Sequence, residues 1–218
     1  MIAAFFLFST SRPASLNGMI KKLFVIALLA LVAYCYWPRH PDLLAYQPRE
    51  MAALQIQAAR QAGGKQWVAY AVTSFKIHTG QYGFPPLTAA GIAMDSSRAV
   101  SLYRSSVDET DKEEALKPLT SAYETIKAQT GKTYDPKAVA QLEMKTWSLL
   151  KEEAKNEVIA ANMSEEMALI YGGPPKKYLE PAQFFTAALK ETQASSWPAA
   201  QQNLQKGWAD LQRVARSK

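Results

Sequence analysis

The chain has 218 residues, of which 48% are hydrophobic, and a formal net charge of +6. This size suffices for one domain with its own core, and a single cysteine excludes an internal disulfide. The positive charge lies in the N-terminal part, because residues 95–218 carry 17 basic and 17 acidic side chains. This balance argues against nucleic acid as a ligand.

An apolar run from Leu23 to Trp37 follows Lys21 and Lys22, as in an export signal or a membrane anchor. At ~1.5 Å per residue the run covers roughly 22 Å, less than the ~30 Å of a hydrocarbon core. It ends in aromatic residues instead of the small residues that signal peptidase requires. We therefore expect residues 19–37 to be an uncleaved, single-pass anchor in the inner (cytoplasmic) membrane, with a periplasmic or otherwise extracytoplasmic C-terminal domain. A cleaved, soluble product is the alternative.

Two further features of the N-terminal region bear on its processing. Residues 1–18 add a second, shorter apolar run, which we interpret as a non-native or cytoplasmic extension that precedes the true start at Met19. Cys35 is a candidate for lipidation, but Tyr34 stands where that processing needs a small residue, so the sequence disfavours it.

The segment from Met51 to Met94 contains no Asp or Glu, whereas it contains Arg60, Lys65 and Lys76. Next to a membrane, such a segment suits anionic lipid headgroups or an anionic cell-wall polymer. A small excess of basic residues also keeps a domain soluble, and this is the interpretation that we favour.

The remainder of the chain predicts a mostly α-helical bundle in a single domain, residues 49–218. Prolines predict a stiff stalk over residues 38–48, and the segment 66–77 suits either a helix or a short β element. Pro118 predicts a kink or a helix start. Helices are predicted over residues 49–62, 99–107, 116–131, 135–161, 164–171, 178–189 and 204–215.

Three carboxylates are predicted to project into or beside the apolar face of the helix 135–161: Glu143, Glu153 and Glu157. A buried carboxylate needs a cation, a shifted pKa or a metal. Metal sites in helical bundles usually add histidine ligands, and the only histidines are His40 and His78, so we expect neither a metal nor a cofactor. A ligand pocket of these glutamates beside Trp147 is the sharper hypothesis, and ion pairs or a solvated rim are the plainer one.

The loop of residues 80–86 presents Tyr82 and Phe84, as partner-binding loops do, although such aromatics more often pack against their own domain. No phosphate-binding loop, Cys-x-x-Cys pair or Gly-x-Ser-x-Gly motif occurs, so the sequence assigns no catalytic residue.

A spaced pattern in the C-terminal half resembles a group of uncharacterised bacterial helical proteins. It comprises Tyr134-Asp135-Pro136, Val139-Ala140, Leu142-Glu143, Trp147, Tyr171-Gly172, Pro174, Trp197, Leu204 and Trp208. The chain departs from the group at Ser148 and Lys151, where the relatives have an aromatic residue and an arginine. The resemblance supports the predicted positions of the helices and makes Glu143 a residue of interest. It implies no activity.

From these features we expect a membrane-tethered envelope protein whose helical domain acts as an interaction or assembly module. A small-ligand binding domain or an enzyme with a carboxylate pocket around Glu143 is the alternative.

Overall fold

The computed structural model describes residues 16–36, 40–106 and 109–217, and the chain divides into two compact units, Met1–Trp37 and Pro38–Lys218. The first unit contains α1 (Leu16–Tyr36), whose described side chains, residues 23–34, are all exposed. Among the described residues, no helix combines the length and the apolar character needed to cross a membrane. The predicted extension 1–18 and the side chain of Cys35 lie essentially outside the described part.

The second unit is built from helices, and no strand occurs among the residues described. The predicted all-α class is therefore confirmed. The segment 66–77, left open between helix and strand, is helical: residues 67–76 form an α-helix that buries Thr73 and Ser74 and leaves Val68 and Val72 exposed. The elements are α2 (Pro48–Gly63), α3 (Trp67–Lys76), the π-helical turn η1 (Ile77–Gln81), α4 (Pro86–Ser105), α5 (Glu109–Thr130), α6 (Pro136–Lys151), α7 (Asn156–Tyr171), the 3₁₀ turn η2 (Pro175–Tyr178), α8 (Leu179–Gln193) and α9 (Trp197–Arg216).

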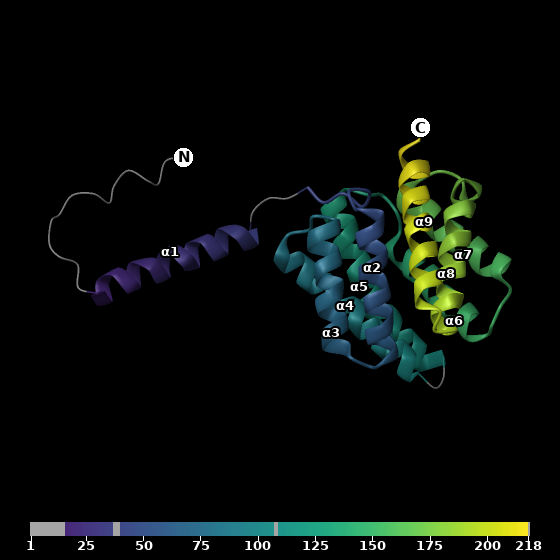
Figure 1. The fold of residues 1–218 in the computed structure, drawn as a ribbon, viewed down its shortest axis with the longest axis horizontal. Coiled ribbons are helices and arrows are strands. Elements are labelled where there is room, and N and C mark those ends of the chain that lie inside the picture. The colour runs from purple at the N-terminus through teal and green to yellow at the C-terminus, as the bar shows by residue number, and fades with distance from the viewer. Residues whose placement is uncertain (1–15, 37–39, 107–108, 218) are drawn as a thin grey trace. The chain divides into compact units, whose positions relative to one another are not determined.

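The helices of this unit form a closed ring (Figure 1). Each helix from α2 to α8 packs against the next one in the chain, and α9 returns to pack against α2. Helix α5 continues through Pro118 as a single element. At Gly207, α9 lies so close to α8 that a Cβ atom there would be 3.1 Å from Cε1 of Phe185.

Part of the predicted stalk contributes to the core. Leu43 and Tyr46 are buried, with 7% and 2% of their surface exposed. The Tyr46 hydroxyl donates to the backbone oxygen of Trp208 (2.9 Å), and Nε2 of Gln212 donates to the backbone oxygen of Leu44 (2.7 Å). The entry of the chain into the domain is thus attached to its last helix.

Three of the helix–helix connections have the same geometry. Each has a non-glycine residue with positive φ, namely Lys65 (56°), Glu153 (53°) and Ser195 (57°). The amide that follows donates to a carbonyl five residues earlier, as from Ala154 to Leu149 (2.9 Å), which is the Schellman helix ending.

This geometry corrects the predicted helix 135–161. The chain reverses at Glu153, so that α6 and α7 are separate helices, and the predicted helix 164–171 is the second half of α7. The prediction failed for two reasons. Val158 and Ile159 lie at helical spacing from the apolar residues of α6, and no glycine or proline marks the turn between the helices.

We expect Glu153→Gly to raise the free energy of unfolding by about 0.5–1 kcal/mol, because glycine adopts positive φ without the cost that a Cβ atom imposes. Urea unfolding of residues 38–218, which form a unit with its own core, measures the change. Glu152→Gly is the matched control, since Glu152 has φ −82° and gains nothing from glycine. An equal response of the two variants would contradict this account of the turn.

Candidate carboxyl site

Two carboxyl groups lie on either side of one tyrosine hydroxyl between α5, α6 and α7. Oη of Tyr123 donates to Oε2 of Glu143 at 2.8 Å and lies 3.4 Å from Oε1 of Glu166. Tyr134 holds this arrangement, because its hydroxyl donates to the backbone oxygen of Tyr123 (3.0 Å). Three consecutive helices thus bring a donor and two acceptors together.

Asn162 adds an unsatisfied acceptor to the α6–α7 interface. It is only 3% exposed, and its Nδ2 donates to the backbone oxygen of Leu142 (2.7 Å) and to Oγ1 of Thr146 (2.9 Å). Its Oδ1 is buried without a hydrogen-bond partner. Because Asn162 precedes Glu166 by four residues, both side chains lie on the same face of α7. A buried acceptor without a donor is costly, and this acceptor belongs to the face of α7 that also carries Glu166.

Burial raises the pKa of both carboxyl groups. For Glu143, desolvation outweighs the hydrogen bond from Tyr123, which acts in the opposite direction. The pKa of Glu166 is raised well above the ordinary value, first by desolvation and then by the negative charge of Glu143. The pKa of the Tyr123 hydroxyl is also raised well above its ordinary value, mainly by burial. Glu166 therefore retains its proton at pH values at which an exposed glutamate is ionised.

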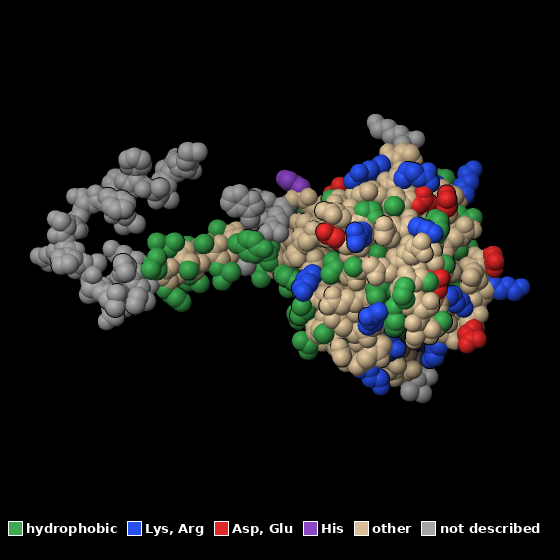
Figure 2. Space-filling view, in the orientation of Figure 1, with side chains coloured by type: hydrophobic (Ala, Val, Ile, Leu, Met, Phe, Trp, Pro, Cys, Tyr) green, Lys and Arg blue, Asp and Glu red, His purple; other side chains and the backbone are tan. Residues whose placement is uncertain are grey.

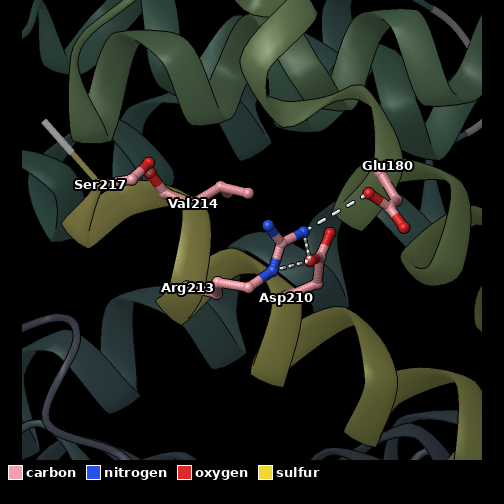
Figure 3. Close-up of polar contacts among 5 residues, drawn as sticks. All are labelled: Glu180, Asp210, Arg213, Val214 and Ser217. Atoms are coloured by element: carbon pink, nitrogen blue, oxygen red, sulfur yellow. Dashed lines mark hydrogen bonds and ion pairs between the residues drawn. The ribbon is translucent and has the colours of Figure 1, made fainter.

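Within the described part of the chain, no ion pair involves either of these carboxyl groups. The ion pairs among the described residues lie instead at α8 and α9 (Figure 3). Arg213 contacts Asp210, and its Nη2 lies 3.5 Å from Oε2 of Glu180. That arginine is 65% exposed, so the pairs contribute little to stability. The ion-pair form of the plainer hypothesis, in which a cation neutralises Glu143, therefore has no support among the described residues. The solvated-rim form agrees with the partial exposure of Glu143 and Glu166.

The other predicted pocket residues divide between this site and the surface. Trp147, one turn after Glu143 on α6, packs with Tyr123 against the small core cluster of α4, α5 and α6, and its ring lies 5.0 Å from that of Tyr103. Glu153 and Glu157 are exposed, Glu153 in the turn and Glu157 in the first turn of α7. The prediction that they share a face with Glu143 is wrong, because it required one continuous helix.

The predicted partner loop packs against its own domain. Phe84 is fully buried, and the Tyr82 ring lies 6.2 Å from that of Tyr46 and 5.8 Å from that of His78. Phe84 is therefore not available to a partner.

A hollow of about 400 Å³ lies elsewhere, where α2 meets α9. Its lining is rich in glutamine and includes none of the carboxyl groups above: Ala53, Ile56, Gln57, Arg60, Gln61, Gln66 and Gln201. Arg60 lies over the Trp197 ring, 4.8 Å from its centroid. This hollow does not extend the carboxyl site.

Among the described residues, no group of three or more His, Cys, Asp or Glu side chains is arranged to hold a metal ion. The carboxyl site instead holds two interacting glutamates that lose their protons in two successive steps, so that one carboxyl group can donate a proton while the other accepts one. This arrangement suits proton transfer or the binding of an organic cation.

The sequence did not single out three members of the site, Tyr123, Asn162 and Glu166. Glu166 is the clearest case. Its position suggested a first-turn residue that favours a helix start. The four-residue spacing of Asn162 and Glu166 could have indicated that two polar side chains share a helix face. It indicates this only if both residues lie on one helix, whereas the predicted helices ended at 161 and began at 164.

We expect Glu166→Gln to stabilise the domain at neutral and alkaline pH. A raised carboxyl pKa means that the folded state binds a proton that the unfolded state has lost, so its contribution is complete below about pH 4.5 and is lost as pH rises through the raised pKa. Thermal unfolding from pH 4.5 to 9 should show that the variant and the natural chain converge at acid pH and separate progressively above it. The neighbouring exposed Glu165→Gln is the control; a parallel response of both variants would contradict the assignment.

Comparisons of this chain with protein-family models, with curated proteins and with solved structures give no match.

Proposed function

We propose that the protein is a membrane-tethered helical domain, held outside the cytoplasm, that acts as an interaction or assembly module of the envelope. The observation that carries the proposal is α1, in which every described side chain from Leu23 to Tyr34 is uncharged and exposed. Such a surface is unstable in water and calls for an apolar environment. Lys21 and Lys22 before it support an N-terminus in the cytoplasm.

Cell fractionation tests this proposal. The full chain should stay with the membrane after alkaline carbonate extraction, and external protease should digest residues 40–218 once the outer barrier is opened. Removal of residues 19–37 should abolish the membrane association that resists carbonate extraction. Recovery of the full chain in the supernatant would contradict the tether.

The second candidate function is binding of a small organic cation at Glu143 and Glu166. It is favoured by two carboxyl groups that have no cation among the described residues, and by the unsatisfied Oδ1 of Asn162. An ammonium group supplies both the charge and the missing donor, and its binding would displace the proton of Glu166.

Calorimetric titration with putrescine tests the second candidate. If the amine binds there, the heat should differ between buffers of different ionisation enthalpy, because a proton is released. Glu143→Gln should weaken binding, and Glu165→Gln should leave it unchanged. The same affinity in both variants would exclude this site.

A further inference from the structure

The outer face of α3 and α4 is apolar. The side chains that form it are exposed to an unusual degree: Val68 (81%), Val72 (50%), Leu87 (53%) and Met94 (67%). We call these four residues the α3–α4 face. Val68 and Val72 lie one turn apart on α3, and Leu87 and Met94 lie two turns apart on α4, so each pair lies on one side of its helix.

The two helices present these residues as neighbours. α3 and α4 pack against each other, and Oγ of Ser97 donates to the backbone oxygen of Trp67 (3.2 Å). This bond places the end of α3 that carries Val68 beside the part of α4 that carries Met94. Figure 2 shows apolar side chains at the edge of the domain where Figure 1 places α3.

Basic residues lie on the same sides of the two helices. Lys76 follows Val72 by four residues on α3, Arg98 follows Met94 by four on α4, and Lys65 lies just before α3; all three are exposed. The first acidic residue after Glu50 is Asp95, which is partly buried and accepts a hydrogen bond from Oγ of Ser121 (2.7 Å). The α3–α4 face therefore combines apolar side chains with positive charge, and no ion pair among the described residues neutralises Lys65, Lys76 or Arg98.

This combination distinguishes between the two anionic partners that the charge alone allows. An anionic cell-wall polymer is hydrated and offers no environment for four exposed aliphatic side chains. A bilayer surface offers anionic headgroups for the cations and an acyl boundary for the aliphatic groups.

The chain also keeps this face near the membrane, if α1 is embedded there. The amide of Asp42 donates to the backbone oxygen of Tyr82 (3.1 Å), in the connection between α3 and α4. Asp42 follows Tyr36 by six positions in the chain, and six extended residues span about 20 Å at most. A link of this length favours an encounter between the domain and the bilayer that would hold α1.

We propose that the α3–α4 face docks on the surface of an anionic lipid bilayer; this inference rests on the proposed tether. Docking places Val68 and Met94 at the acyl boundary and Lys65, Lys76 and Arg98 among the headgroups. Each basic side chain near an anionic surface contributes about fivefold to binding, so reversal of all three charges should lower the ratio of docked to free domain by at least on the order of 100-fold.

The test uses the full chain with Cys35→Ser, which removes the only cysteine. Val68→Cys and Met94→Cys are labelled with a polarity-sensitive dye, and the chain is reconstituted into vesicles of phosphatidylcholine with or without phosphatidylglycerol. We expect a blue shift of both dyes on anionic vesicles at 0.1 M salt, and its loss at 1 M salt, where the Debye length falls from ~10 to ~3 Å. Val158→Cys on α7, 47% exposed, is the matched control and should show no shift.

Flotation with neutral vesicles separates this inference from the tether, which needs no anionic lipid. A chain that floats but shows no shift at Val68 and Met94 on anionic vesicles overturns docking and leaves the tether intact. A chain that floats only with anionic vesicles and shows the shift supports docking and overturns the tether. A shift with isolated cell-wall polymer, and none with vesicles, also overturns the inference.

Discussion

Trp208→Ala should lower the free energy of unfolding of residues 38–218 by about 3–5 kcal/mol, because it removes the largest side chain at the contact that closes the ring. The Trp208 ring lies 4.8 Å from that of Tyr46 and 4.9 Å from that of Phe185, and only 8% of the residue is exposed. The surrounding helices cannot collapse into the space, since Gly207 already brings α9 against Phe184 and Phe185. Urea unfolding followed by circular dichroism measures the loss.

Two variants show which interactions of Trp208 matter. Trp208→Phe keeps most of the ring contacts but loses the bond from Nε1 to Oε1 of Gln55 (2.7 Å), so it should cost about 1 kcal/mol. Trp197→Ala, on the same helix, removes a partly exposed ring that packs at the margin of the core beneath Arg60, and it should cost about 1 kcal/mol. If Trp197→Ala were as damaging as Trp208→Ala, the core would not be centred on Trp208.

His78 should make the domain sensitive to acid. Burial lowers its pKa to about 4, although Nδ1 hydrogen-bonds to the backbone oxygen of Ser74 (2.8 Å). The unfolded chain binds a proton near pH 6.5, so the contribution of neutral His78 is complete above that value and is lost as pH falls towards 4. The full loss is up to roughly 3 kcal/mol.

The measurement is the difference in unfolding free energy between the natural chain and His78→Gln from pH 7 to 4. We expect the natural chain to lose stability relative to His78→Gln as the pH falls from 7 to 4. Below pH 4 the difference should level off. His40→Gln is the control, because His40 is exposed and lies before the first core residue. A difference that stays constant with pH would show that His78 is protonated equally in the folded and unfolded states.

The all-α class followed from the helical spacing of apolar residues, and so did several helix bounds. Pro48 and the pair Gly63-Gly64 delimit α2 where expected, because both residue types act through the backbone alone. The break at Glu153 could not be predicted in the same way. A glutamate at positive φ carries no local signal, and only the packing of α6 against α7 makes that conformation favourable.

The carboxyl site shows the same limit. Glu143 was identified because it lies beside the apolar face of a well-defined helix. Its partners Tyr123 and Glu166 lie 20 residues before it and 23 after it, on other helices. Their approach depends on the crossing of three helices, about which hydrophobic periodicity says nothing. Glu153 and Glu157 were assigned to the site in error. They have helical spacing from Glu143, but helical spacing does not show that residues belong to one continuous helix.

The closing contact between Tyr46 and Trp208 joins residues 162 positions apart, and this determines when the domain can fold during synthesis. Until α9 has left the ribosome, Met51 and Ile56 of α2 lack the helix that covers them. The local hairpins α3–α4 and α6–α7 can form early, but the ring stays open and its apolar interior exposed. A nascent chain can therefore complete this core only after α9 has been synthesised, and we expect a chain that terminates before Leu204 to aggregate.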